Sequence, residues 1–569
     1  MRTLRRDVII IGGGSAGCVL ASRLSEDPSC QVLLLEAGRD DLPGEEPWHI
    51  LDTFFSAPYH DDNLWPDLQV KWTRPIEAGE PVRPPQRYLQ ARVIGGGSSI
   101  NAMAAPRGLP DDYDEWERLG ALGWNSRTVV PFFSRIETDR DFQGPMHGAS
   151  GPIPIRRIPR SDWPPFVRAV AETLEGRGMP WVADMNTDPR DGVCSLPLSS
   201  TPEHRVSAAM AYLTPEVRER SNLRIQSRTC ATRLRIKHGK VCGVEAVGTG
   251  GVEVYPAAEV VLCAGALHSP LLLMRSGLGP ADLLEKAGLR VAAEIPGVGR
   301  NLQEHPTCAI AGFLRQTAVQ QTDLRPGISI MLRMSSRCSL GVPSDLFIGV
   351  PNKVAWHAFG QRLGALNVAL NRPESRGEVR LERGVDGPVP VFDFNLLGEQ
   401  ADRERMRAGF REACSIVMSP AVQEQLLDTF VASFSPRVLR ANRRSIMNGV
   451  QARALTMLLD LSGVLRRALL DRIVSDGPRL PRLMEDDAAL DAWLRRNCTG
   501  WFHPVGTCRM GAAVDPMAVT GPVTARVHGV TGLRVVDASV MPRIPRANTN
   551  LTTMMIAERF AEAIAADRA

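Results

Sequence analysis

The feature that most constrains the fold of this chain lies in its first 36 residues. Asp7–Ile11 is a short, β-branched apolar run, which is typical of a buried parallel strand. A glycine-rich turn follows at once, in which Gly12, Gly14 and Gly17 form the pattern G-x-G-x-x-G. Apolar residues at helical spacing come next, and then a second apolar run that ends in Glu36. This order predicts a βαβ unit with a tight glycine turn between its first strand and its helix.

Such a turn suits a dinucleotide for physical reasons. The first glycine permits the tight turn, the second lets the backbone approach a pyrophosphate, and the third lets the helix pack closely on the strand. The N-terminus of the helix adds unpaired N–H groups and a positive dipole end. Glu36 is placed to accept hydrogen bonds from a ribose diol and would repel a 2′-phosphate, which disfavours NADP. The motif alone leaves NAD and FAD open.

A competing motif overlaps the same turn. Residues 13–17 also match G-x-S-x-G, the nucleophile elbow of serine hydrolases, with Ser15 as the nucleophile. That motif would lie on the first strand of the chain, before any loop that could supply an oxyanion hole, and it leaves Glu36 unexplained. The sequence therefore favours a dinucleotide site over a hydrolase.

Composition excludes several other classes. The chain has 569 residues, which corresponds to about four domain-sized units, with ordinary apolar (44%) and charged (23%) fractions. A net charge of +4 gives no reason to expect nucleic acid as a partner. The eleven cysteines form no C-x-x-C pair, and no H-x-x-H occurs, so we expect no metal and a reducing, cytoplasmic location. No apolar run is long enough to predict a membrane span.

Periodicity predicts the coarse organisation of the rest. We expect a helical region over 111–137 with a break at Pro131, a meander of strands over 222–262, further strands over 310–400, and mostly helices over 401–495. A final helix is predicted over 552–565. The segment 37–90 lacks clear periodicity and is rich in Pro, Trp and Asp, so both a lid and a packed surface loop remain open.

Four longer segments carry a resemblance to a known family. They are 92–101 (RVIGGGSSIN), 265–279 (GALHSPLLLMRSGLG), 503–511 (HPVGTCRMG) and 537–558 (DASVMPRIPRANTNLTTMMIAE). Together with the first glycine turn they resemble the glucose–methanol–choline (GMC) FAD-dependent oxidoreductases, from residue 5 to beyond residue 560. Within that family the chain looks most like bacterial 5-hydroxymethylfurfural and aryl-alcohol oxidases, and more distantly like pyridoxine oxidases and choline-type dehydrogenases.

The resemblance implies an α/β fold, α+β overall, in two domains. A Rossmann-like FAD-binding domain would be discontinuous, built from 1–150, 200–308 and 485–569. A substrate-binding domain with an antiparallel sheet and flanking helices would come from 151–199 and 309–484. The resemblance leaves the oligomeric state undetermined.

It also implies FAD and a set of residues that hold it. The residues expected near the pyrophosphate, the adenosine, the flavin, the ribityl chain and the start of the final helix are Gly12, Gly14, Ser15, Ala16, Glu36, Arg92, Val93, Ser99, Asn101, Ala102, Ala231, Asp537, Ala538, Thr549, Asn550 and Thr552. Some members attach FAD through a His just before the Asn of the second glycine turn. Ile100 occupies that position and has no nucleophile, so we expect non-covalent FAD.

The same resemblance points to His503 as the catalytic base, because an imidazole can take the hydroxyl proton as hydride leaves the alcohol carbon. Asn548 would donate a hydrogen bond to the developing alkoxide, with a helix N-cap as the alternative. Phe502 and Trp501 are candidate walls of the alcohol pocket, and core aromatics are the alternative for both. His305 is assigned a structural role, and His268 none.

The implied reaction is oxidation of a furanic or benzylic primary alcohol to an aldehyde, by hydride transfer to flavin N5 with O2 as the acceptor and hydrogen peroxide as the product. Onward oxidation of the aldehyde hydrate to an acid stays open. One alternative is a choline-type dehydrogenase that passes electrons to a quinone or carrier. Another is a hydroxynitrile lyase that keeps FAD as a scaffold.

Overall fold

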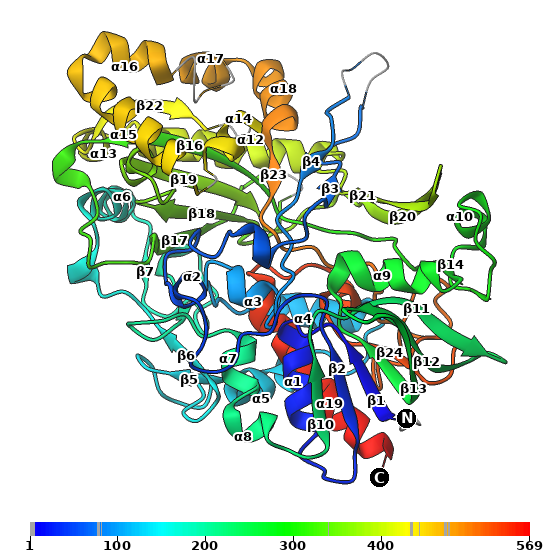
Figure 1. Ribbon diagram of the computed structural model, residues 1–569. Helices are drawn as coiled ribbons and strands as arrows, with labels where there is room; N and C mark the ends of the chain where they lie inside the picture. Colours follow the sequence, from blue (N-terminus) through cyan, green and yellow to red (C-terminus); the bar gives the residue numbers. More distant parts are fainter. Residues whose placement is uncertain are drawn as a thin grey trace.

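The computed structural model describes residues 6–76, 80, 82–338, 341–432, 436–442, 444–470, 475 and 478–568. Two large sheets, with helices packed around them, form the body of the molecule (Figure 1). The mixed α/β fold agrees with the fold class expected from the sequence.

The first sheet contains the predicted βαβ unit. Its strand order is β10-β2-β1-β13-β12-β11, with β24 on the other edge of β13. The bounds are β1 Arg6–Ile11, β2 Val32–Leu35, β10 Leu223–Gln226, β11 Cys230–Lys237, β12 Lys240–Gly248, β13 Gly251–Leu262 and β24 Leu533–Val535. Strands β10, β2, β1, β13 and β24 pair in parallel, whereas β11 and β12 form the predicted antiparallel meander. Helix α1 (Ser15–Leu24) follows the glycine turn and packs on β1 and β2.

The second sheet is almost wholly antiparallel. Its order is β22-β16-β19-β18-β17-β8-β7, with β23 on β16, and only β7 and β8 pair in parallel. The bounds are β7 Trp181–Val182, β8 Gly192–Ser195, β16 Pro306–Leu314, β17 Ile328–Met334, β18 Leu346–Pro351, β19 Leu363–Leu370, β22 Leu426–Val431 and β23 Thr499–Gly500. Helix α12 (Gln400–Val417) packs across β16, β18 and β19.

The structure differs in three details from the helices predicted by periodicity. The helical region 111–137 does not break at Pro131, which lies inside α5 (Ser126–Ile136). The break comes earlier, after α4 (Pro110–Arg118), where Gly120 and Gly123 have φ of +94° and +83°. The mostly helical region 401–495 also contains strand β22, whose apolar residues complete the second sheet. The final helix, α19 (Thr549–Arg568), begins before the predicted residue 552.

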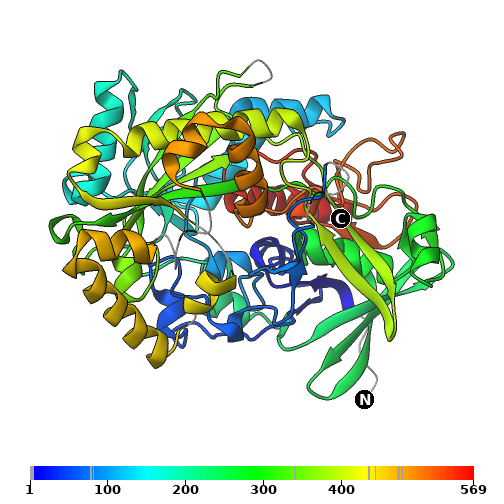
Figure 2. The same ribbon diagram turned by 90° about the horizontal axis from the view of Figure 1, so that it is seen from above.

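The remaining elements surround the two large sheets (Figure 2). The helices are α2 Trp48–Leu51, η1 Asp61–Asn63, α3 Gly97–Ile100, η2 Arg160–Asp162, α6 Pro165–Gly176, α7 Ala208–Tyr212, α8 Pro215–Arg218, α9 Gly265–Arg275, α10 Ala281–Lys286, η3 Gln316–Ala318, α11 Ala358–Gln361, α13 Pro420–Gln423, α14 Pro436–Ala441, α15 Ile446–Leu461, α16 Gly463–Leu469, α17 Leu480–Glu485, α18 Asp487–Asn497 and η5 Ala538–Val540. The strands are β3 Gln69–Val70, β4 Gln86–Arg87, β5 Glu137–Asp139, β6 Ile153–Arg156, β9 Leu198–Ser199, β14 Leu278–Gly279, β15 Ala293–Glu294, β20 Glu378–Gly384 and β21 Gly387–Asp393.

A large cavity lies between the two sheets. The carboxyl ends of β1, β2 and β13 reach its wall at Ile11, Leu35 and Cys263, which is where parallel α/β sheets bind ligands. The second sheet reaches the same cavity through Thr307 of β16 and Asn367 of β19.

All eleven cysteines are free and most are buried, so they act as small core residues.

Candidate active site

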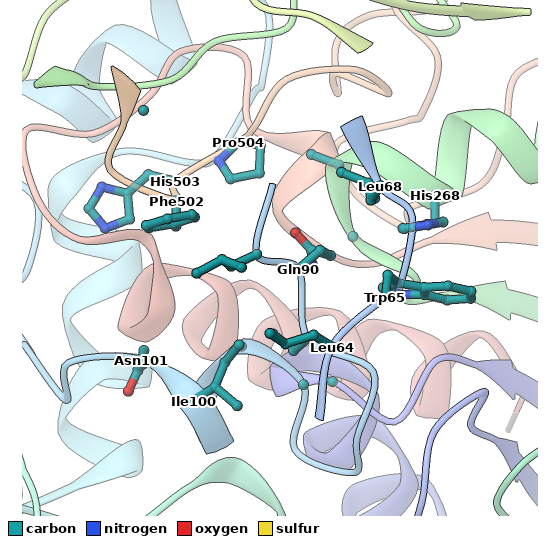
Figure 3. A pocket seen from close by; sticks show the side chains of 18 of the residues that line it. Leu64, Trp65, Leu68, Gln90, Ile100, Asn101, His268, Phe502, His503 and Pro504 are labelled. Carbon is teal, nitrogen blue, oxygen red and sulfur yellow. The ribbon is translucent and has the colours of Figure 1, made fainter. Parts of the chain in front are cut away.

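The cavity has a volume of about 1350 Å³, which is ample for a dinucleotide with a substrate beside it. Figure 3 shows His503 and Phe502 on one side of it, with Trp65 and His268 on the other. Much of the intervening wall comes from the segment 37–90, including Leu64 and Gln90.

The two glycine-rich turns of the sequence pack directly against each other at one end of the cavity. The Gly95 N–H donates to the Gly13 carbonyl over 2.6 Å. Gly96 has φ of +54°, and a Cβ there would lie 2.7 Å from the Gly14 Cα. Helix α1 has no side-chain cap, and Gly14 and Ser15 at its start line the cavity. The N–H groups of this helix end are therefore available to an anionic ligand such as a pyrophosphate.

Two buried carboxylates are fixed by backbone N–H groups along the same wall. Glu36 accepts from Gly13 N–H (2.8 Å) and Gly38 N–H (2.7 Å), and burial raises the pKa of its carboxyl to about 7. Asp537 accepts from Gly265 N–H (2.9 Å) and from the Ser269 hydroxyl (2.6 Å), and burial likewise raises its pKa. Both carboxylates line the cavity and are held rigidly, as hydrogen-bond acceptors for ligand hydroxyl groups should be.

A second helix points its N-terminus at the cavity. Thr549 and Asn550, the first residues of α19, both line the wall. The Ser15 hydroxyl donates to Asn550 Oδ1 over 2.8 Å, which ties the start of α1 to the start of α19. The positive dipole ends of two helices therefore converge on one ligand site.

His503 lies at the other end, between two hydrogen-bonding partners. Its Nδ1 is 2.9 Å from Nδ1 of His305, and its Nε2 is 3.0 Å from Nδ2 of Asn548. Only 8% of His503 is exposed, and burial lowers its pKa to about 3, so the imidazole is neutral at pH 7. A neutral imidazole is the form that can accept a proton.

The partners determine which nitrogen of His503 accepts it. The Asn548 amide nitrogen can only donate, so Nε2 of His503 is the acceptor and the ring proton resides on Nδ1. That Nδ1–H then donates to Nδ1 of His305, which is fully buried. The Asn548 amide therefore selects the tautomer in which Nε2 of His503 is the acceptor, and His305 accepts from the opposite side of the ring.

Asn548 does not cap α19 through its side chain. Its Oδ1 is buried and accepts no hydrogen bond from the described residues, including the first turn of the helix that it precedes. The N-cap interpretation of this residue is wrong. The amide nitrogen instead donates to His503, and the residue lines the cavity wall.

Glu304 organises the loop that carries His503, and the sequence interpretation missed it. Its carboxylate accepts from the N–H of His503 (2.9 Å), the N–H of His305 (2.8 Å) and the N–H of Trp501 (3.3 Å). Burial raises the pKa of this carboxyl to about 8. The available signal was its position beside His305 in GRNLQEHP.

Phe502 has a strained backbone next to the base. Its φ is +64°, a left-handed conformation that a bulky residue rarely adopts, and its ring is 43% exposed beside the Tyr88 ring (5.2 Å). Trp501 also lines the cavity, with its ring 5.9 Å from that of His503. Non-glycine residues in such conformations cluster at functional sites.

Most of the residues expected at the site line this one cavity. They are Gly12, Gly14, Ser15, Ala16, Glu36, Val93, Asn101, Ala102, Ala231, Trp501, Phe502, His503, Asp537, Ala538, Asn548, Thr549 and Asn550. Three do not reach its wall. The Ser99 hydroxyl donates to the Ile94 carbonyl, Thr552 is buried against the Tyr113 hydroxyl (3.1 Å), and the Arg92 guanidinium stacks on Trp65 (5.0 Å).

His268, to which we gave no role, belongs to this wall. Its ring stacks on Trp65 with centroids 4.6 Å apart, and Arg92 lies over Trp65 as well. Burial lowers the pKa of His268 to about 4, so the stack carries a neutral imidazole at pH 7. The side chain of Trp65 is thereby fixed at the edge of the cavity.

A separate cluster outside the cavity, formed by Glu137, Asp139 and His147, has a spacing that could hold a metal ion. Its carboxylates are already neutralised, since Arg107 pairs with Glu137 and Arg157 pairs with Asp139 (2.7 Å). We therefore interpret it as a buried ion-pair network.

None of the helices in the described part of the chain is both long and apolar enough to cross a membrane.

Comparison with known proteins identifies the relatives of this arrangement. The GMC oxidoreductase family profile matches residues 6–307 with its N-terminal part and 373–557 with its C-terminal part. The chain is 36% identical to 5-(hydroxymethyl)furfural oxidase from Methylovorus sp. (strain MP688), over 98% of both chains. It is 33% identical to human mitochondrial choline dehydrogenase, over 98% of this chain and 89% of the relative. The structure of pyridoxine 4-oxidase from Mesorbium loti superposes with a TM-score of 0.79 at 29% identity, over 98% of this chain and 99% of the other.

Proposed function

Because the chain belongs to the GMC oxidoreductase family of FAD-dependent enzymes that act on alcohols, we propose that it oxidises a small, uncharged primary alcohol of the furanic or benzylic type to the aldehyde. The proposed electron acceptor is O2, and the second product is hydrogen peroxide. The observation that carries the proposal is the neutral, hydrogen-bonded His503 at the end of a cavity whose opposite end is built for a dinucleotide.

The residues of the cavity fit FAD. Gly12, Gly14 and Ser15 would hold the pyrophosphate, because a Cβ at Gly12 would strike the Cys263 carbonyl at 2.5 Å and the helix end is uncapped. Glu36 would accept from the ribose, and Asp537 from the ribityl region. Bound FAD supplies the hydride acceptor of the reaction. Ile100 lines the cavity with an aliphatic side chain, so we infer that the flavin is held without a covalent bond.

The protein's own part in the chemistry follows from the tautomer of His503. Its Nε2 would take the hydroxyl proton of the alcohol as the C–H bond breaks, while His305 holds the Nδ1–H in place. The Asn548 amide at 3.0 Å would turn between Nε2 and the substrate oxygen, placing that oxygen beside the base. Because His503 is only 8% exposed, few water molecules can compete with its Nε2 as the proton acceptor.

The wall near the base favours an uncharged, planar substrate. The cavity-lining residues from β16, β17 and β19 in the described part of the chain are Thr307, Ile328, Met331 and Asn367, none of them acidic. A quaternary ammonium alcohol would find no carboxylate on these strands to neutralise its charge. The rings of Phe502 and Trp501 instead offer stacking surfaces to a furan or benzene ring.

The eleven free cysteines support a reducing, cytoplasmic location.

Two measurements test the proposal. Anaerobic mixing of the holoenzyme with an alcohol should bleach the oxidised flavin, and in air the same alcohol should generate one peroxide per aldehyde. A flavin that stays oxidised with substrate would indicate a lyase, whereas bleaching without peroxide would indicate a dehydrogenase. His503→Ala should retain FAD and lose bleaching by about 10² to 10⁴-fold. Bleaching at the wild-type rate in that variant would refute the assignment of the base.

A further inference from the structure

One pair of helices carries a dense group of exposed apolar side chains. Eight large apolar side chains between residues 446 and 465 are exposed: Ile446 (90%), Met447 (65%), Val450 (59%), Met457 (70%), Leu458 (43%), Leu461 (74%), Val464 (81%) and Leu465 (37%). They belong to α15 and α16, which lie at the outer edge of the molecule in both ribbon views (Figures 1 and 2). Soluble surfaces normally scatter such residues singly, so this concentration indicates an interaction face.

Helix α15 is apolar on two sides, and the fold uses only one of them. Its inner side packs Ala452 and Leu459 against a cluster that includes Phe313 and Phe359. Its outer side carries the exposed stripe, which continues onto α16 at Val464. A helix that is apolar all round is normally buried, so we expect the outer side of α15 to contact an apolar environment outside the protein.

The positive charge around these apolar residues indicates the kind of partner. Helices α15 and α16 carry Arg453, Arg466 and Arg467 and a single acid, Asp460, which is paired with Arg362 (2.8 Å). Arg466 and Arg467 pair with Asp428 of β22, whereas Arg453 is exposed between Val450 and Met457 on the same helical side. An apolar stripe flanked by arginines matches an interface of acyl chains and anionic headgroups. A two-fold contact with a second copy would instead bring these arginines against one another.

An aromatic residue extends the face toward the cavity. Trp48 is 59% exposed, and the Arg444 guanidinium lies between its ring (4.8 Å) and the ring of Trp356 (5.6 Å). Both Arg444 and Trp356 line the cavity wall. Tryptophan and arginine at such a position are typical of the membrane–water boundary.

We propose that α15 and α16 dock this enzyme on an anionic phospholipid surface, with the exposed apolar stripe in the acyl–headgroup boundary and the cavity wall at Arg444 beside the headgroups. Helix α15, Ile446–Leu461, has 16 residues and is too short to span a bilayer, so it lies along the surface. The proposal concerns where the protein works and does not depend on which alcohol it oxidises.

Vesicle co-sedimentation of the full-length holoenzyme tests it. Wild-type protein should bind vesicles of phosphatidylcholine with about a third phosphatidylglycerol, bind pure phosphatidylcholine much less, and be released by salt. Leu461→Asp with Val464→Asp should weaken binding by more than about tenfold. The matched control is Val385→Asp with Val514→Asp, two side chains that are 102% and 91% exposed elsewhere, and it should bind as the wild type does.

A readout of the fold accompanies the binding assay. All four residues are exposed and lie outside the cavity wall, so both double variants should retain FAD and turn over a water-soluble alcohol at the wild-type rate. Failure of the wild type to bind anionic vesicles would overturn the proposal, as would equal binding by the Leu461/Val464 variant. So would a wild-type dimer, seen by sedimentation velocity, that becomes monomeric in that variant, because the face would then belong to a second copy.

Discussion

His305 offers the sharpest test of how the site works, because its ring touches the base and does not line the cavity. It is fully buried, and its Nδ1 accepts from the Nδ1–H of His503 over 2.9 Å. In His305→Ala that N–H has lost its acceptor in a buried position. The ring of His503 is then free to rotate, and the tautomer with its proton on Nε2 becomes accessible.

The expected size follows from that lost hydrogen bond. A hydrogen bond is worth about 1 kcal/mol more when one partner is charged, as the His503 ring becomes when it takes the proton, and losing that difference corresponds to about fivefold in rate. Loss of the base itself in His503→Ala should cost about 10² to 10⁴-fold. His305→Ala should therefore lie between wild type and His503→Ala in its rate of flavin reduction, with FAD content and apparent substrate affinity close to those of the wild type.

The assay is anaerobic stopped-flow reduction of the flavin, read at its visible absorbance maximum, over a range of alcohol concentrations. The double variant His305→Ala, His503→Ala should be no slower than His503→Ala alone, because His305 acts only through the base. His528→Ala is a control, since that ring contacts the Gly511 carbonyl (3.2 Å) and lies outside the cavity wall. Wild-type reduction in His305→Ala, or additive losses in the double variant, would refute the reasoning.

Three further predictions concern residues around the site. Burial raises the pKa of Glu304 from 4.5 to about 8, so its contribution to stability is present at low pH and is lost as pH rises through about 8. The Gln side chain of Glu304→Gln cannot ionise, so the unfolding temperature of this variant should rise relative to that of the wild type as pH increases from 4.5 to 8. A constant difference in unfolding temperature across this pH range would contradict the prediction. Gly96→Ala should lose FAD and several degrees of unfolding temperature, since its Cβ would lie 2.7 Å from the Gly14 Cα, whereas the Cβ of Gly97→Ala meets no protein atom within 4 Å and should leave the unfolding temperature of the cofactor-free protein unchanged. Phe502→Gly should be more stable than Phe502→Ala by about 1 kcal/mol in denaturant unfolding, because only glycine relieves φ of +64°, and equal values would argue against strain there.

Local patterns in the sequence determined the dinucleotide half of the protein. The apolar run, the glycine turn and Glu36 lie within 36 residues, and each acts through backbone geometry that depends on its immediate neighbours. The parallel β1–β2 pair, the meander of β11 to β13 and the last helix could be predicted for the same reason. The misplaced helix break shows the limit, because Pro131 fits inside α5 while two glycines with positive φ end the preceding helix segment.

Tertiary structure alone decided the state of the base and the face on α15. His305 and His503 are 198 positions apart in the chain, and β23 brings them together by pairing with β16. A resemblance could point to His503, but the proton position on its ring depends on contacts from His305 and Asn548 that no local pattern encodes. The apolar residues of α15 look alike in the sequence, and only packing against Phe313 and Phe359 separates the buried side from the exposed one. Periodicity predicts that a helix has an apolar side, whereas burial depends on what the rest of the chain brings against it.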